Sequence, residues 1–184
     1  MSHPGPTADV SVRIAWADDA PAIARVQSRA WREAYADLLP AEVLAAMSED
    51  EVAEVWHASL SRPKDARNRV LVALERNRVT GVAVTAPASD PDCDPVADGE
   101  LLELVVAAED RGAGHGSRLL QASAETLAAD RFSRAVTWVA STDDAQREFL
   151  ESGGWGADTA HRELDLRGDG GVTVKQVRLH TALY

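Results

Sequence analysis

The chain has 184 residues, of which 45% are hydrophobic and 27% are charged. This balance is typical of a globular protein and excludes a mostly disordered chain. At this length we expect one domain with a single core. The 19 basic and 30 acidic residues give a net charge of −11. Such a charge repels phosphate backbones, so it argues against nucleic acid as a partner and favours cationic ligands.

Cysteine content and hydropathy narrow the class of protein further. With Cys93 as its only cysteine, the chain cannot form an internal disulfide or a cysteine-based metal cluster. The acidic stretch around Asp90, Asp92 and Asp94 lacks the glycine and the final glutamate of a calcium loop, so we expect no metal. We find no run of ~18 apolar residues that could span a membrane, and Met1 to Pro6 lack the features of a secretion signal. We therefore expect a cytoplasmic protein with no membrane partner.

The first third of the chain predicts a strand followed by helices. Alternating apolar residues favour a short strand, and an acidic pair before Pro21 is typical of a helix start. Ser48 and Glu51 form a capping-box pattern that predicts another helix. The predicted elements are a loose tail over residues 1–9, a strand over 10–14, and helices over 20–39, 41–47 and 49–62.

The remaining two thirds predict a sheet with two further helices. The strands are recognised by runs of β-branched and apolar residues, and the helices by apolar residues at helical spacing. With no internal repeat and no linker, residues 10–184 are expected to form one α/β (α+β) domain with a mixed sheet. The predicted strands are 70–74, 79–86, 101–106, 135–140, 160–166 and 172–180, with helices after residue 116 and over 145–150.

One glycine-rich turn carries the chemical information of this sequence. It follows the strand ending at Val106 and opens a helix, with glycines at positions 112, 114 and 116. Glycines let the backbone approach a ligand closely and point its N–H groups outward, and a helix N-terminus favours an anion such as a diphosphate. The spacing does not match the dinucleotide fingerprint Gly-x-Gly-x-x-Gly, and Ser117 is not preceded by the lysine of a P-loop.

The pattern Arg111-x-x-Gly114-x-Gly116 resembles the pyrophosphate loop, Arg/Gln-x-x-Gly-x-Gly/Ala, of the GNAT superfamily (GCN5-related N-acetyltransferases). The resemblance continues through Arg13–Pro40, Glu100–Val106 and Asp143–Trp155, so it covers most of the chain. It implies a GNAT-like acyl-CoA N-acyltransferase fold, in which helices flank a mixed central sheet of about seven strands.

The same resemblance implies acetyl-CoA as cosubstrate. Backbone N–H groups of the loop would hold the pyrophosphate, and the preceding strand would hydrogen-bond the pantetheine arm as an added strand. The N–H of Val106 would stabilise the oxyanion, and Asp143 replaces an asparagine that usually meets the pantetheine arm. His115 would contribute its N–H, with its side chain pointing to solvent. The implied cofactor-binding residues are Leu104, Val105, Val106, Arg111, Gly112, Ala113, Gly114, His115, Gly116, Ser117 and Asp143.

The catalytic groups are less completely defined by the resemblance. Glu100 occupies the strand position of a general base, since an ammonium substrate must lose a proton before it attacks. Glu103 is the alternative, although it faces the opposite side of the strand unless a bulge intervenes. The family's usual proton-donating tyrosine falls at Leu150, so a water, the Ser141 hydroxyl or unassisted thiolate departure must serve.

Two functions remain open from the sequence. The first is an acetyl-CoA-dependent N-acetyltransferase in which a primary amine attacks the thioester directly in a ternary complex. The acceptor is a small molecule or peptide, and the acidic chain favours a cation. The second is an acyl-CoA-binding sensor with little turnover. Transfer of longer acyl groups, which would differ from the first function only in pocket depth, is also left open. Trp31 and Tyr35 share a helix face, as core residues or as a wall of the acceptor pocket. A homodimer is also left open.

Overall fold

Seven strands form one sheet in the order β1-β2-β3-β4-β5-β7-β6. The computed structural model describes residues 10–184, so the tail expected over residues 1–9 lies outside the described part. All neighbouring strands are antiparallel except β4 and β5, which are parallel. The strands are β1 (Val10–Ile14), β2 (Arg69–Glu75), β3 (Arg78–Pro87), β4 (Asp98–Val106), β5 (Arg134–Ala140), β6 (Gly156–Asp165) and β7 (Thr173–Ala182).

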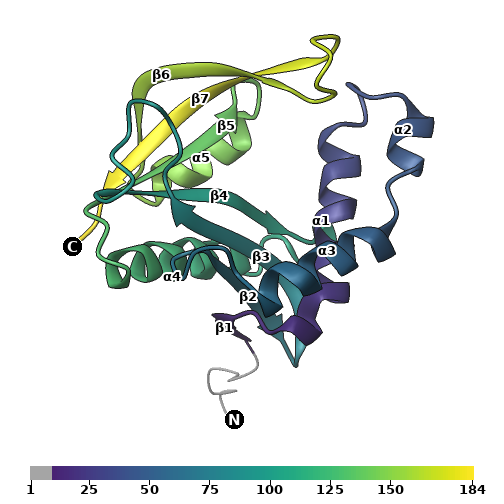
Figure 1. Ribbon diagram of the computed structural model, residues 1–184, viewed down its shortest axis with the longest axis horizontal. Coiled ribbons are helices and arrows are strands. Elements are labelled where there is room, and N and C mark those ends of the chain that lie inside the picture. The colour runs from purple at the N-terminus through teal and green to yellow at the C-terminus, as the bar shows by residue number, and fades with distance from the viewer. Residues whose placement is uncertain (1–9) are drawn as a thin grey trace, which may run out of the picture.

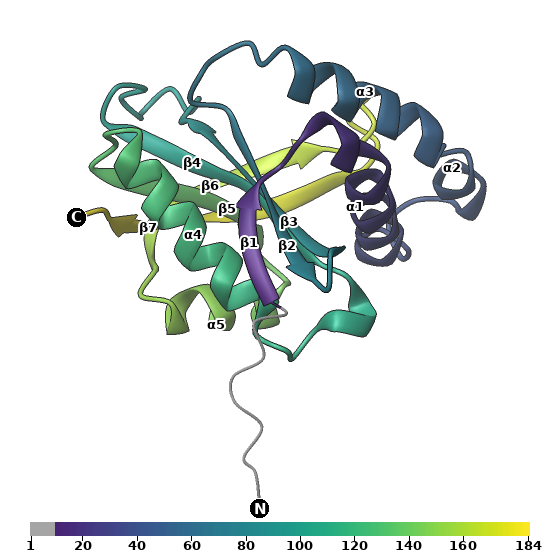
Figure 2. The ribbon, with the colours of Figure 1, turned by 90° about the horizontal axis from the view of Figure 1, so that it is seen from below.

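Helices cover both faces of this sheet, with α1 and α3 on one side and α4 and α5 on the other (Figures 1 and 2). The mixed, helix-flanked sheet confirms the predicted fold class. Among residues 10–184, no helix is long and apolar enough to cross a membrane. The helices are α1 (Ala20–Ala34), α2 (Ala41–Ala45), α3 (Glu49–Ser61), α4 (His115–Ala129) and α5 (Asp144–Ser152), with single 3-10 turns η1 (Ala17–Asp19) and η2 (Ala108–Asp110).

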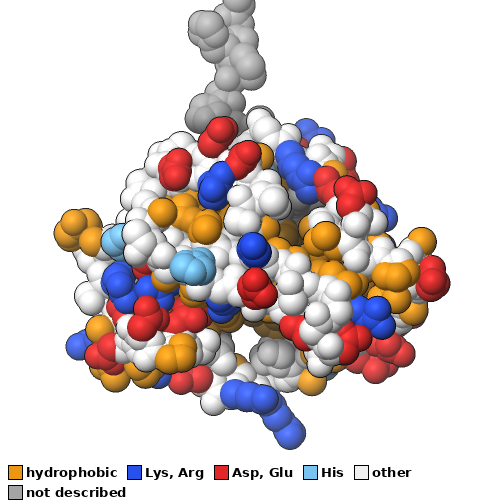
Figure 3. Space-filling view, turned by 90° about the horizontal axis from the view of Figure 1, so that it is seen from above, with side chains coloured by type: hydrophobic (Ala, Val, Ile, Leu, Met, Phe, Trp, Pro, Cys, Tyr) orange, Lys and Arg blue, Asp and Glu red, His pale blue; other side chains and the backbone are white. Residues whose placement is uncertain are grey.

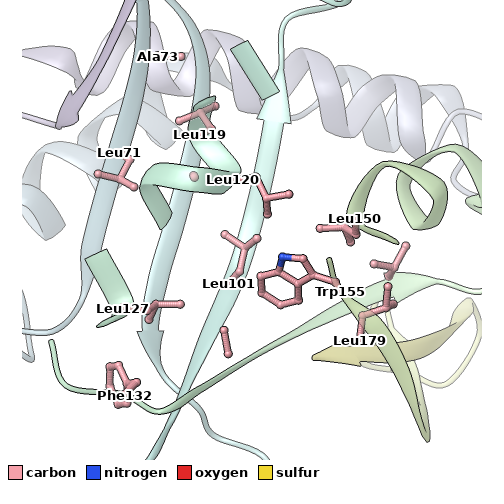
Figure 4. Close-up of a cluster of buried hydrophobic side chains, with 13 residues drawn as sticks. Leu71, Ala73, Leu101, Leu119, Leu120, Leu127, Phe132, Leu150, Trp155 and Leu179 are labelled. Atoms are coloured by element: carbon pink, nitrogen blue, oxygen red, sulfur yellow. The ribbon is translucent and has the colours of Figure 1, made fainter. Parts of the chain in front are cut away.

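Two hydrophobic clusters hold the layers together, one on each face of the sheet. On one face, Ile23 and Val26 of α1 pack against valines of β2 and β3. On the other, leucines of α4 pack against β2 and β4, and Trp155 lies beside Leu101 and Leu150 (Figure 4). The sheet is therefore buried on both faces where it supports the glycine-rich turn.

The helix starts follow the sequence signals with one exception. Ser48 caps α3, since its hydroxyl accepts the N–H of Glu51 at 3.3 Å. The acidic pair expected to cap α1 acts differently. Asp19 accepts two hydrogen bonds from Arg13, at 2.7 and 3.0 Å, and makes no side-chain cap to α1. This carboxylate therefore ties β1 to the turn before α1.

The predicted strands are present, but the ends of the late strands are shifted. β6 begins at Gly156, four residues before the predicted start at Ala160. Its pairing with β7 is irregular between Ala157 and His161, and Thr159 has a positive φ of 73°. This irregularity breaks the side-chain alternation from which a strand is recognised in a sequence.

A β-bulge interrupts β4 at Leu102. Opposite β3, the register shifts between Val84, which pairs with Glu103, and Thr85, which pairs with Leu101. Leu102 is therefore the extra residue of the bulge. Leu101 is only 2% exposed, whereas Leu102 is 51% exposed.

These neighbouring leucines provide a matched test of the core. Leu101→Ala should lower the free energy of unfolding by about 2–5 kcal/mol, because it leaves a cavity between β4 and α4. Leu102→Ala should change it by no more than about 0.5 kcal/mol. Urea denaturation followed by circular dichroism measures both, and equal losses in the two variants would contradict the bulge.

Candidate active site

The main cleft lies between α1, the free edge of β4, the glycine-rich turn and the start of α5, with a volume of about 800 Å³. On the face seen from above, hydrophobic side chains line a hollow, and acidic and basic side chains stand around it (Figure 3). The cleft is lined by Leu104, Val105 and Val106 of β4 and by most of the predicted loop, namely Arg111, Gly112, Gly114, Gly116 and Ser117.

The free edge of β4 arises because β4 and β5 separate. They pair only from Asp98–Glu100 to Arg134–Val136, and the last link is the Thr137 hydroxyl, which donates to the Leu101 carbonyl at 2.7 Å. From Leu102 onward, no strand of the described chain pairs with this edge of β4. The separation leaves room for an extended ligand between the two strands.

The direction of the backbone groups on this edge follows from one hydrogen bond. Ala107 N–H donates to the Thr80 carbonyl of β3 at 2.8 Å. Because the bonding direction alternates along a strand, the N–H groups of Leu104 and Val106 point away from β3 and into the cleft. The Val105 N–H points to β3 and is not available to a ligand in the cleft. Val105 therefore contributes only its side chain and its place in the cleft wall.

The glycine-rich turn has the backbone conformation that its glycines allow. Gly112 and Gly114 have φ values of 77° and 85°, in the left-handed region that disfavours other residues. Gly114 is the N-cap of α4, and Arg118 fastens the turn by donating to the Ala113 carbonyl at 3.3 Å. The turn therefore presents the N-terminus of a 15-residue helix to the cleft, a position that suits an anionic group.

The side chain of His115 does not point to solvent as expected. It is 1% exposed, and its Nε2 lies 3.4 Å from the carboxylate of Glu75 at the end of β2. The side chain of His115, the first residue of α4, therefore points inward toward the β2–β3 hairpin, which is distant in sequence. Glu75, Asp110 and His115 lie close enough to share an ion. Arg78 already binds both oxygens of Asp110 at 2.7 Å, which disfavours a metal there.

Because of the bulge at Leu102, Glu100 and Glu103 lie on the same face of the sheet. Side chains alternate along a regular strand, so residues three apart normally face opposite sides. The extra residue shifts this alternation by one position, so both carboxylates point to the side of the sheet covered by α1. Burial raises the pKa of both carboxyl groups, as expected for charges moved away from water.

Glu103 is held in place by two donors from α1. Gln27 Nε2 donates to Oε2 at 2.6 Å, and Trp31 Nε1 donates to Oε1 at 2.9 Å. Gln27 is itself oriented by Trp56 Nε1 at 2.8 Å. The pKa of Tyr35 is raised, first by burial and then by the charge of Glu103. Trp31 and Tyr35 therefore belong to the surroundings of this carboxylate rather than to the core alone.

Glu100 lies deeper, where β4 and β5 still pair, and is 3% exposed. Its Oε2 has no hydrogen-bond partner. Besides burial, the nearby charge of Asp90 raises the pKa of Glu100, whereas Arg162 and Arg178 act in the opposite direction. This carboxylate is thus buried, imperfectly paired and surrounded by charged groups.

The acidic loop before β4 is bound by arginines and an indole. Arg178 donates to both oxygens of Asp92 at 2.7 and 2.8 Å, and Trp138 Nε1 donates to Asp90 at 2.7 Å. The carboxylates that resemble calcium ligands in the sequence are therefore engaged in ion pairs and hydrogen bonds. Burial also raises the pKa of the Cys93 thiol in this loop.

An ion pair that the sequence did not reveal joins α1 to the loop. Arg111 donates to both oxygens of Glu33 at 2.8 and 2.9 Å, and its Nε donates to the Val106 carbonyl at 3.3 Å. The Arg111 side chain therefore binds one of the carbonyl acceptors on the free edge of β4. No local pattern could have indicated Glu33, which is 78 residues away in sequence.

The two remaining positions that the sequence singled out lie just before α5 and within it. Asp143 caps the helix by accepting the N–H of Gln146 at 3.0 Å, and it also lines the cleft. Leu150 is 1% exposed and belongs to the core. The position where the family commonly has tyrosine therefore carries no hydroxyl group.

Comparisons with known proteins agree with this geometry. Residues 23–155, well over half of the chain, match the Acetyltransferase (GNAT) family. The uncharacterized N-acetyltransferase YuaI of Bacillus subtilis (strain 168) is 28% identical over 130 residues, which are 71% of each chain. The chain therefore belongs to the GNAT family and is an acetyltransferase.

Solved structures show the same fold. An N-acetyltransferase from Staphylococcus aureus Mu50 superposes with a TM-score of 0.74 and 17% identity, over 96% of this chain and 100% of that one. YncA of Salmonella typhimurium, described as an acetyltransferase and solved with its cofactor acetyl-CoA, gives 0.70 and 19%, over 96% and 95%. The paia N-acetyltransferase of Thermoplasma acidophilum, in complex with coenzyme A, gives 0.64 and 15%, over 91% and 97%.

The raised pKa of Glu100 makes a prediction about stability. The folded protein holds this proton more tightly than the unfolded chain, whose glutamate titrates near 4.5. The contribution of this bound proton to the free energy of unfolding is present below pH 4.5, and it is lost as the pH rises through the raised pKa of Glu100. Glu100→Gln should therefore melt at a higher temperature than the wild type at pH 7.5, and this advantage should disappear at pH 4.

Glu148→Gln is the matched control, since Glu148 is exposed on α5. It should follow the wild type at both pH values in differential scanning calorimetry. A Glu100→Gln variant that melts below the wild type at pH 7.5 would show that the ionised carboxylate is stabilising.

Proposed function

We propose that the protein transfers an acetyl group from acetyl-CoA to a primary amine, which attacks the thioester directly in a ternary complex. The observation that carries this proposal is the free edge of β4 next to a helix N-terminus. An extended pantetheine chain can hydrogen-bond an exposed strand edge, and a diphosphate suits the glycine-rich turn. The cleft of about 800 Å³ has room for both and for an acceptor.

The proposed cofactor contacts are those suggested by the sequence. Leu104 and Val106 offer N–H groups to the pantetheine amides and the thioester oxygen, with Val105 between them in the cleft wall. The backbone from Arg111 to Ser117 surrounds the pyrophosphate. Asp143 contributes a carboxylate oxygen beside the start of α5.

In the reaction, the amine nitrogen forms a bond to the thioester carbonyl carbon and the C–S bond then breaks. The Val106 N–H stabilises the negative charge that develops on the carbonyl oxygen. The CoA sulfur leaves as thiolate, which is a good leaving group because a free thiol has a pKa of about 8.5. Leu150 cannot supply a proton, so water or the Ser141 hydroxyl protonates the thiolate, or it is released as such.

We assign the two glutamates different roles. Glu100 is the general base, reached through water, because its Oε2 has no partner and its raised pKa makes it a better proton acceptor near neutral pH. Both oxygens of Glu103 already accept hydrogen bonds from Gln27 and Trp31. These two hydrogen bonds oppose the effect of burial on the pKa of Glu103 and favour its ionised form, whose charge attracts the ammonium form of the acceptor. A small cation or a peptide amine fits this site and the net charge of −11.

A thiol-release assay with acetyl-CoA and a panel of cationic primary amines tests the function. Turnover is expected with at least one amine and should be abolished or strongly reduced in Gly114→Val. A side chain at Gly114, with φ of 85°, strains the turn and blocks the approach of the pyrophosphate. Affinity for CoA should fall tenfold or more, about 1.4 kcal/mol, by calorimetry.

Gly168→Val is the matched control, because Gly168 has a similar φ of 73° with open space around it. It lies in the β6–β7 turn and should retain CoA affinity. If CoA binds normally to Gly114→Val, the loop assignment is wrong. If CoA binds to the wild type but no amine is acetylated, the protein is an acyl-CoA sensor.

The roles of the two glutamates predict different kinetics. Glu100→Gln should lower kcat/KM by roughly 10²–10⁴ at neutral pH, the usual contribution of general base catalysis. The deficit should shrink at high pH, where the amine is already neutral. Glu103→Gln should mainly raise the KM of a cationic amine. Wild-type rates for Glu100→Gln at all pH values, together with a pH-dependent deficit in Glu103→Gln, would reverse the assignment.

A further inference from the structure

A second, smaller cavity of about 60 Å³ lies beside the main cleft, between α1 and the segment that follows β4. It shares Glu33 and Arg111 with the main cleft, so the Arg111–Glu33 ion pair stands between the two. Four arginines line it, namely Arg25 and Arg29 on α1, Arg78 at the start of β3, and Arg111. In a chain with 19 basic and 30 acidic residues, this local excess of arginine opposes the overall charge.

Two of these arginines are fully paired. Arg78 donates to both oxygens of Asp110 at 2.7 Å. Arg111 donates to both oxygens of Glu33 at 2.8 and 2.9 Å. Such bidentate pairs fix the guanidinium planes, so these two arginines form a rigid part of the cavity wall.

The other two arginines are not neutralised. Arg29 lies 3.7 Å from Glu109, with the two side chains 60% and 58% exposed, and an exposed pair of this kind contributes little. Arg25 is half-buried, and within residues 10–184 it has no ion pair or hydrogen bond. A guanidinium group has five donors and no acceptor. The cavity thus offers guanidinium donors that have no hydrogen-bond acceptor within residues 10–184.

We propose that this cavity binds a phosphate group. Arg25 and Arg29 are four residues apart on α1, so they lie on one helix face and can approach the same oxygen atoms. Arginine pairs with phosphate in bidentate geometry. The cavity of about 60 Å³ has room for one such group. Arg111 connects the cavity to the glycine-rich turn, which is the proposed pyrophosphate site.

The phosphate could have two sources with the same chemistry. One is the 3′-phosphate ester of CoA, and this source rests on the proposed function. The other is free inorganic phosphate, whose binding does not depend on any transferase activity. The two sources are distinguished by the ligand used, and Arg25 is the residue to change because it makes no contact that the fold requires.

The experiment measures binding rather than turnover. Calorimetric titrations use inorganic phosphate, CoA and 3′-dephospho-CoA at constant ionic strength, with wild type, Arg25→Gln and Arg29→Gln. Arg62→Gln is the control, because Arg62 is exposed at the end of α3 and its replacement changes the net charge equally. Equal melting temperatures in phosphate-free buffer show that the variants are folded.

We expect at least a fivefold loss of phosphate affinity in Arg25→Gln, a smaller loss in Arg29→Gln and none in Arg62→Gln. If the 3′-phosphate occupies the cavity, wild type binds CoA more tightly than 3′-dephospho-CoA, and Arg25→Gln removes this preference without changing affinity for 3′-dephospho-CoA. Phosphate binding that depends on Arg25, without a preference between the two nucleotides, supports the free anion. The proposal is overturned if neither phosphate affinity nor the CoA preference depends on Arg25.

Discussion

The cleft exists because β4 and β5 separate soon after they begin to pair. The strands pair over three residues each, and beyond that point the edge of β4 that faces away from β3 has no neighbouring strand in the described chain. Unpaired backbone N–H and C=O groups are costly when buried, so a free edge in the middle of a sheet is stable only if it faces solvent or a ligand. The cleft next to β4 provides that exposure, and the cores on both faces keep the edge rigid.

The bulge at Leu102 sets the chemistry of this edge. It brings Glu100 and Glu103 to one face and keeps Leu101 in the core. Beyond it, the alternation of backbone groups directs the N–H groups of Leu104 and Val106 into the cleft. One inserted residue therefore determines where two carboxylates and two donors lie relative to the glycine-rich turn.

The sequence predicted those parts of the protein that depend on local pattern. The glycines at 112, 114 and 116, the cap at Ser48 and the alternation of the early strands all follow from neighbours in sequence. The inward turn of His115, the Arg111–Glu33 pair and the bond from Trp31 to Glu103 join segments 40 to 78 residues apart. No periodicity encodes such contacts. The sequence did not decide whether the strand containing Glu100 and Glu103 has a bulge, because a single inserted residue leaves the apolar pattern of a strand almost unchanged.

We expect the free edge of β4 to receive the pantetheine chain of CoA as an added strand. Residue-resolved amide hydrogen exchange by NMR, with and without CoA, tests it most directly. CoA should slow exchange at Leu104 and Val106, whose N–H groups point into the cleft, and should change it little at Val105, whose N–H points to β3. If exchange at Leu104 and Val106 is unchanged at saturating CoA, the pantetheine chain does not bind this edge.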